Sequence, residues 1–298
     1  MNERKPDRVG QVFAALGKSV CYVTLFLGVQ VAVMLPLMVS IITESLLGES
    51  MVDEEAVAAL LSADAVTLSL ISGLITMAIV LAFYLIRRKK LSEALMLRPV
   101  PAPTLLTAAS LAPGLYLVVT VALAMLPEAW LESYEEASEG VASGTLVGVI
   151  AVAVVAPIVE EFIFRGLVMN RLSRVMPGWL AVVLSAAVFG LCHGHPVWFA
   201  YAFVLGAVFA FVDLRAGSIW PSILGHVAFN AIGQVFSFIP ETEEGTELII
   251  AMGVLLAVGV IAPILNRKAI GALLRPAPPP EQEPPAKPKT YDFDPWEL

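Results

Sequence analysis

Long apolar segments separated by short polar ones make up most of this 298-residue chain. Eight of them are near the length of about 20 residues with which a helix crosses the hydrocarbon core of a bilayer. They are Val20–Ile42, Ala65–Ile86, Thr104–Leu126, Val141–Phe164, Gly178–Cys192, Val197–Val212, Ser218–Phe238 and Leu248–Leu265. The pattern therefore predicts an all-α, polytopic membrane bundle with about eight transmembrane helices.

Composition supports an integral membrane protein. Apolar residues make up 58% of the chain and charged residues only 15%, and the mean hydropathy is +0.83. Soluble proteins have about 45–50% apolar and about 25% charged residues, so a water-soluble core cannot hide this much apolar surface. The two cysteines, Cys21 and Cys192, lie in apolar runs. They offer no disulfide framework and are expected to be small buried side chains.

Charges in the connecting segments alternate in sign along the chain. Basic residues follow the second, fourth, sixth and eighth apolar segments, and acidic residues follow the first, third and seventh. Because basic loops are retained in the cytoplasm, both termini are predicted to be cytoplasmic. The first apolar segment is too long for a signal peptide and is read as an uncleaved helix. In a prokaryotic host, the protein is expected in the plasma or inner membrane.

The chain divides into four parts by composition. Residues 1–19 form a basic cytoplasmic segment, residues 20–140 hold the first three spans, residues 141–266 hold the candidate chemistry and the last span, and residues 267–298 form a proline-rich tail. A tail of this composition is expected to be disordered in the cytoplasm. No phosphate-binding loop or short repeat is found, and no nucleic-acid partner is expected.

Two adjacent carboxylates end an uncharged stretch that runs over residues 147–159. Glu160 and Glu161 would lie at membrane depth, where a charge persists only with a partner, a cavity or a reaction to hold it. Glu161 and Arg165 are four residues apart, so a helix brings them to one face as an ion pair. Glu160 is rotated by about 100° on that helix and is free to face something else.

All three histidines of the chain lie in or beside predicted spans. His193 ends the fifth span, and His226 and Asn230 are one turn apart on one face of the seventh. A single intramembrane histidine often only bridges helices, but combined with Glu160 these residues suggest a site. His195 precedes a proline near a membrane boundary, where a capping or interfacial role is expected.

These residue types suit hydrolysis of a carbonyl compound. A carboxylate can take a proton from water as the water attacks a carbonyl, and histidine and asparagine can donate to the oxyanion that forms. The same residues suit a divalent metal such as zinc, with His193, His226 and Glu160 as ligands and a water in the open position. The sequence has no HExxH motif, and spacing alone leaves metal-dependent and metal-independent mechanisms open.

Three motifs carry a resemblance to a known family. Glu160-Glu161-x-x-x-Arg165, Phe189-x-x-x-His193 and His226-x-x-x-Asn230 follow one another on three apolar segments. Together they resemble the CPBP family (CAAX protease and bacteriocin-processing, or Abi), whose members include the type II CAAX prenyl endopeptidases. The similarity covers roughly residues 146–238. Each motif alone is weak, whereas the three in this order are specific.

The resemblance implies a role for each residue. Glu160 resembles the general base, and His193 resembles the histidine that binds or orients the water or a metal. His226 and Asn230 resemble the pair that forms the oxyanion hole, and Glu161 and Arg165 would support Glu160. The expected activity is cleavage of a membrane-associated peptide bond, in a prenylated CAAX protein or a leader peptide.

Two other function classes stay open. A transporter would use the carboxylates and histidines to relay protons or bind a cation, although no duplication between the chain halves is evident. A non-catalytic immunity or membrane-assembly factor of the same family is the other. One point also strains the catalytic reading. Simple counting puts Glu160 and His193 at depths that differ by about 10 Å, unless the fourth helix continues beyond Arg165 or the fifth is offset.

Overall fold

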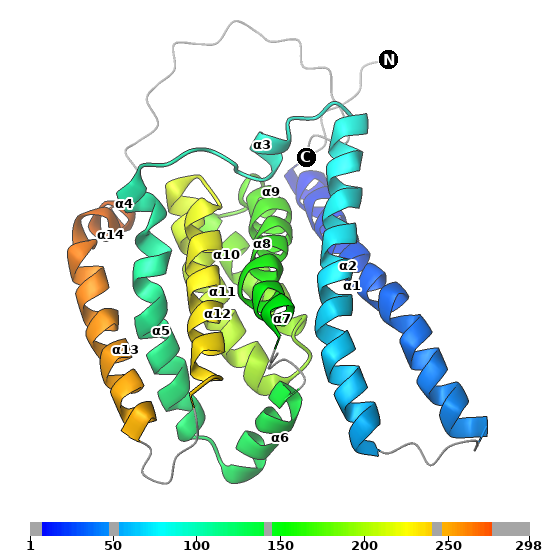
Figure 1. Ribbon diagram of the computed structural model, residues 1–298. Helices are drawn as coiled ribbons and strands as arrows, with labels where there is room; N and C mark the ends of the chain where they lie inside the picture. The colour runs from blue at the N-terminus through cyan, green and yellow to red at the C-terminus, as the bar shows by residue number, and fades with distance from the viewer. Residues whose placement is uncertain (1–7, 48–53, 140–144, 240–245, 276–298) are drawn as a thin grey trace, which may run out of the picture.

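The computed structural model describes residues 8–47, 54–139, 145–239 and 246–275. Every regular element within these ranges is a helix (Figure 1). The helices are α1 (Arg8–Leu47), α2 (Glu54–Ile86), α3 (Leu91–Ala94), α4 (Ala102–Leu105), α5 (Thr107–Ala124), α6 (Glu128–Glu139), α7 (Leu146–Ile150), η1 (Ala151–Val155), α8 (Ala156–Glu161), η2 (Phe162–Met169), α9 (Asn170–Ser173), α10 (Gly178–Leu191), α11 (Pro196–Ala216), α12 (Trp220–Phe236), α13 (Thr246–Leu265) and α14 (Arg267–Leu274). The predicted all-α fold is confirmed.

Six helical stretches within the described residues are long and apolar enough to cross a bilayer, so the chain is a multi-pass integral membrane protein. They are Arg8–Pro36, Thr67–Ile86, Ala102–Ala124, Leu146–Ser173, Pro196–Ala216 and Thr246–Leu265. The other two predicted spans are helices as well, but shorter. Helix α10 has 14 residues and α12 has 17. The predicted count of eight therefore holds for apolar helices, and six of them reach full spanning length.

The fourth helix differs from its predicted bounds in a way that moves the candidate site. It begins at Leu146 and continues as one rod to Ser173, nine residues beyond the predicted end at Phe164. The rod alternates between α-helical and π-helical turns, with η1 and η2 on either side of α8. Such π turns are rare and often occur at functional sites. The extension places Glu160 near the middle of the rod instead of near its end.

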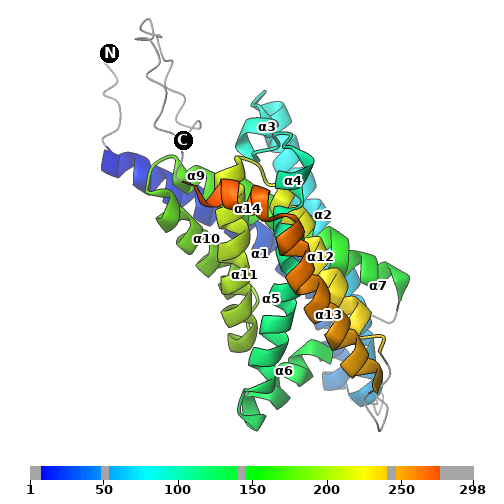
Figure 2. The same cartoon turned by 90° about the vertical axis from the view of Figure 1, so that its left-hand side faces the viewer.

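Helix α10 explains how His193 reaches the same depth. Its 14 residues span about 21 Å, which is less than the hydrocarbon thickness of about 30 Å. The helix begins just after the rod ends, on the side where α9 lies, and the chain then turns back into α11 (Figure 2). His193 lies two residues beyond the end of α10, before the chain turns back into α11. The apparent depth gap between Glu160 and His193 is closed by the extension of the rod and the shortness of α10.

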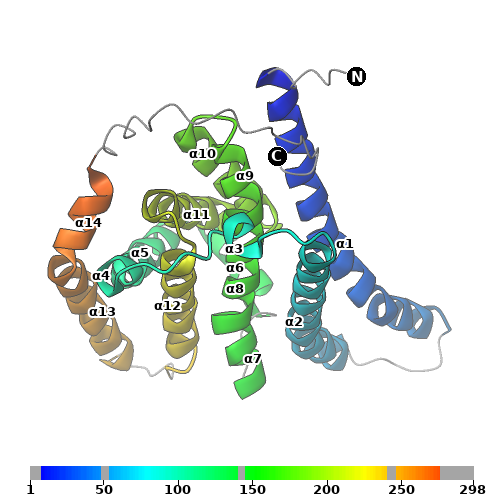
Figure 3. The same cartoon turned by 90° about the horizontal axis from the view of Figure 1, so that it is seen from above.

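The rod occupies the centre of the arrangement. Figure 3 shows α7 and α8 between α12 on one side and α2 on the other, with α5 and α13 beyond α12. The rod contacts α2 and α12, and α10 packs on α11. Buried apolar side chains gather around it in clusters, one of which contains Val159, Ile163, Phe164 and Phe189. The second half of the chain thus surrounds the two carboxylates with packed helices.

Helices α3, α6 and α14 were not predicted from apolar runs. Helix α6 lies at the end of the bundle opposite α9 and α14 (Figures 1 and 2). Helix α14 occupies Arg267–Leu274, so the first residues assigned to a disordered tail are helical. The proline-rich part of the tail lies outside the described residues, as do five acidic residues of the first and seventh connections, Glu49, Asp53, Glu241, Glu243 and Glu244.

Candidate active site

Glu160 and Glu161 end helix α8, and they face different surroundings. Glu160 exposes 22% of its side chain and lines a cavity, whereas Glu161 exposes none. Adjacent helical residues point about 100° apart, so one turn can present one carboxylate to the cavity and the other to the core. The predicted division between a cavity-facing carboxylate and a buried one is present in the structure.

The buried carboxylate is paired as its spacing predicted. Arg165 Nε lies 3.1 Å from Glu161 Oε2, and both side chains are fully buried. Arg165 Nη2 also donates to the carbonyl of Gly206 at 3.4 Å, and its guanidinium lies 4.5 Å from the centre of the Phe189 ring. A buried charge without a partner is costly, and these contacts surround the arginine with a carboxylate, a carbonyl and an aromatic face.

His226 joins the two carboxylates. Its Nδ1 donates to Glu161 Oε1 at 2.8 Å, a contact that the sequence analysis did not predict. Its Nε2 lies 3.6 Å from Glu160 Oε2, which is too long for a direct hydrogen bond but lets one water contact both groups. The ring is thus oriented by a buried carboxylate through one nitrogen and presents the other toward Glu160.

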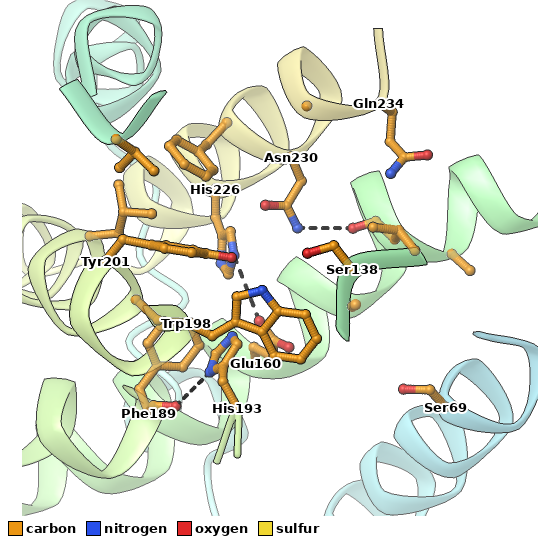
Figure 4. Close-up of a pocket in the computed structure, with 18 of the residues that line it drawn as sticks. Ser69, Ser138, Glu160, Phe189, His193, Trp198, Tyr201, His226, Asn230 and Gln234 are labelled. Carbon is orange, nitrogen blue, oxygen red and sulfur yellow. Dashed lines mark hydrogen bonds and ion pairs between the residues drawn. The ribbon is translucent and has the colours of Figure 1, made fainter. Parts of the chain in front are cut away.

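His193 reaches the same cavity from the end of α10 (Figure 4). Its Nδ1 donates to the carbonyl of Phe189 at 2.9 Å. That bond leaves Nε2 as the nitrogen that can accept a proton or a hydrogen bond. The Phe189 ring packs edge-on against His193 with ring centres 4.8 Å apart, and it also contacts the ring of His226 at 5.8 Å. Phe189 therefore fixes both histidines relative to Arg165.

Asn230 is held by a carbonyl that a proline leaves free. In η1 the amide of Ala156 donates to the carbonyl of Ala151, five residues earlier. Continuing that pattern would pair Val152 with Pro157, but proline has no N–H. The Asn230 Nδ2 donates to the Val152 carbonyl instead, at 3.0 Å (Figure 4). An amide nitrogen has two N–H bonds, so a second donor remains for another acceptor.

The four motif side chains that face inward share one cavity. Glu160, His193, His226 and Asn230 all line a space of about 870 Å³. Its walls also include residues of α1, α2, α5, α6 and α11, among them Gln30, Ser69, Tyr116, Ser138 and Tyr201. The lining therefore extends well beyond the fourth, fifth and seventh spans that carry the three motifs. Cavity residues are mainly apolar, with polar groups concentrated around Glu160 and along α6 and α12.

Helix α6 contributes lining that the apolar pattern could not reveal. Tyr134 lies among the rings of His195, Trp198 and Tyr201, with ring centres 6.4–6.5 Å away. His195 does not line the cavity. Its Nδ1 accepts the amide N–H of Val197 at 3.2 Å and so caps α11, as its position before a proline predicted.

A metal centre needs several ligands that converge on one point. Within the described part of the chain, no group of three or more histidine, cysteine, aspartate or glutamate side chains is placed to hold a metal ion. His193 Nδ1 and His226 Nδ1 are held by a carbonyl and a carboxylate, which leaves each Nε2 as the nitrogen that could bind a metal. The side chains of His193, His226 and Glu160 nevertheless do not converge as a three-ligand set in this arrangement, and we derive no step through a metal.

Comparison with known proteins agrees with the motif region. Residues 142–232 match the family model described as "Type II CAAX prenyl endopeptidase Rce1-like". About a third of the chain is therefore similar to this family. The matched region begins just before the rod that holds Glu160 and ends within α12, two residues after Asn230. The resemblance seen in the three motifs is confirmed for this part of the chain.

One curated relative is similar over a stretch of about the same length as the family match. A Bacillus subtilis (strain 168) protein named "Putative membrane peptidase YdiL" is 28% identical over 92 residues. That stretch is 31% of this chain and 38% of the relative, so the chain matches well under half of the relative's length. No solved structure matches the chain.

Proposed function

We propose that this chain is an intramembrane endopeptidase in which Glu160 activates the hydrolytic water. The observation that carries the proposal is that Glu160, His193, His226 and Asn230, from three separate segments, line one cavity inside a membrane protein. The match to an Rce1-like domain and the similarity to a protein named as a membrane peptidase support this class of reaction.

The geometry suggests how the hydrolysis proceeds. A water between Glu160 and the histidines gives a proton to Glu160 while its oxygen attacks the carbonyl carbon of the scissile peptide bond. His193 Nε2 is free to accept a hydrogen bond and to orient that water. When the tetrahedral intermediate collapses, the proton passes from Glu160 to the leaving amine.

The oxyanion would be stabilised from α12. His226 Nε2, when protonated, and the second N–H of Asn230 can both donate to it. Glu161 holds the His226 ring from the far side, and Arg165 balances the Glu161 charge, so these two residues position the machinery without touching the substrate. Low surrounding dielectric strengthens such donors.

The substrate is proposed to be a membrane-tethered peptide or protein, such as a prenylated CAAX terminus or a leader peptide. An apolar cavity with a polar centre suits a peptide whose anchor stays in lipid. The bilayer itself is the other partner.

The test compares Glu160→Gln with Glu135→Gln, a second carboxylate that lines the same cavity. Both variants remove one negative charge, but only the first removes the general base. We expect Glu160→Gln to lower kcat by about 10²–10⁴-fold on membrane-tethered and farnesylated peptides, while Glu135→Gln retains cleavage. Each is assayed with and without a strong chelator. Wild-type rates in Glu160→Gln would refute the assignment, and loss with chelator that zinc restores would require a metal.

A further inference from the structure

An aspartate outside the three motifs lies buried behind the candidate site. Asp213 belongs to the last turn of α11, and its side chain is fully buried, as is that of Ser222 at the start of α12. The expected span ended at Val212, so the sequence pattern placed this acid at a boundary. A buried carboxylate requires compensating hydrogen bonds. Oδ1 of Asp213 accepts one, and its Oδ2 is buried without a hydrogen-bond partner.

Asp213 connects the end of one helix to the start of the next. Its carbonyl accepts the N–H groups of Gly217 and Ser218 at 2.8 and 3.3 Å, which ends α11. Gly217 has φ +67°, a left-handed conformation that glycine adopts without strain. The side-chain Oδ1 of Asp213 accepts the backbone N–H of Ser222 at 3.1 Å. One residue thus fixes both sides of the turn.

The bond to Ser222 satisfies an amide that α12 cannot satisfy itself. The first-turn N–H groups of a helix have no intrahelical partner. In α12, Pro221 has no N–H, and the Ser222 amide receives its acceptor only from outside the helix, across the turn. The helix therefore begins where Asp213 holds it, with a carboxylate at the favourable end of the helix dipole.

This anchor lies in line with the catalytic side chains of α12. Ser222, His226 and Asn230 are spaced four residues apart and share one face of the helix. His226 is one turn, or about 6 Å, beyond the anchored amide. The rod holds the same helix from the other side, through the Glu161–His226 bond and the Asn230–Val152 bond.

We propose that Asp213 is a positioning residue that sets the register of α12, and with it the placement of His226 against Glu161. The proposal rests on the proposed function for its effect on rate, but its structural part concerns only the His226–Glu161 hydrogen bond. The acceptor oxygen of Asp213 does the positioning, and its charge is not required. Asparagine keeps that oxygen, whereas alanine removes it.

The first readout is independent of activity. The chain has only three histidines, so the ring nitrogens can be labelled with ¹⁵N and followed by NMR in detergent micelles, with His226→Ala assigning the signal. We expect Asp213→Ala to change the His226 Nδ1 signal and Asp213→Asn to leave it as in the wild type. The control is Asn170→Ala, which removes two cross-helix hydrogen bonds of 2.8 and 3.1 Å at the cytoplasmic end.

The second readout is kinetic. Asp213→Ala is expected to lower kcat by about 10- to 100-fold with KM nearly unchanged, because the donor moves while the binding cavity does not. Asp213→Asn should keep both kcat and the signal even where its unfolding midpoint falls. An unchanged His226 signal in Asp213→Ala, or a signal lost in Asp213→Asn, would overturn the proposal. If alanine prevents folding, the asparagine variant alone decides. Absence of cleavage by wild type would sink the proposed function but leave the NMR result standing.

Discussion

The buried pair of Glu161 and Arg165 allows stability to be separated from catalysis. Replacing Glu161 by leucine removes the carboxylate that lies 3.1 Å from Arg165 Nε and 2.8 Å from His226 Nδ1. The direct contacts that the arginine then keeps are neutral, the Gly206 carbonyl at 3.4 Å and the Phe189 ring at 4.5 Å, and the buried Asp213 acts on it only through its electrostatic field. A desolvated cation–π contact contributes about 2 kcal/mol, which does not replace a buried counter-charge.

The single variant Glu161→Leu should therefore lose about 3–5 kcal/mol of stability. Adding Arg165→Met removes the uncompensated charge with an apolar side chain of similar length, and such replacements are often neutral or stabilising. We expect the double variant to recover most of the lost stability. Its kcat should nevertheless remain about 10–100-fold below wild type, because His226 has lost the carboxylate that orients it.

Two measurements on the same preparations decide this prediction. The first is the unfolding midpoint in one detergent, and the second is the initial rate on the peptide used to test Glu160. A double variant as unstable as Glu161→Leu would refute the charge argument. A double variant that cleaves at the wild-type rate would refute the orientation of His226 by Glu161, whatever its stability.

Two further substitutions test how α12 and the rod are held. A Cβ at Gly225 would lie 2.5 Å from the Cβ and 2.9 Å from the backbone carbonyl carbon of Ala108. Gly225→Ala should therefore displace α12 and lower both the unfolding midpoint and kcat. The control Gly253→Ala, whose Cβ would have no atom within 4 Å, should lower neither. Pro157→Ala supplies an N–H that can bond the Val152 carbonyl within the rod, so we expect kcat to fall without loss of thermal stability, and an unchanged kcat would contradict this role of the proline.

Much of the fold could be predicted from the sequence, because membrane helices are recognisable by their length and apolar composition. The pairing of Glu161 with Arg165 and the cap formed by His195 are local, within four residues, and their spacing predicted them. Helix α6 was not predicted, because it is short and largely polar. The continuation of the rod beyond Arg165 was left open from sequence, because Arg165 and Arg171 interrupt the apolar run although the backbone remains helical.

Contacts between distant segments were out of reach for a different reason. Glu161 and His226 are 65 residues apart, and Asn230 and Val152 are 78 apart. Their pairing depends on how α12 lies against the rod, which no local pattern states. Asp213 could be noticed in the sequence as an acid beside an apolar run. The same pattern is typical of a helix boundary at the membrane surface, so it did not indicate a buried carboxylate. Only the packing of α11 on α12 shows that the carboxylate is buried.

The arrangement of the rod accounts for why two adjacent glutamates serve better than one. With only a carboxylate facing the cavity, the Nδ1–H of His226 would point into the core without an acceptor and the ring would not be oriented. A lone buried carboxylate would have no access to water. Because adjacent residues on one helix point about 100° apart, Glu160 can face the cavity while Glu161 fixes the ring from behind, and Arg165 one turn later balances the buried charge. Moving either glutamate by one position would break one of these contacts, so the order of the three residues is dictated by the helix itself.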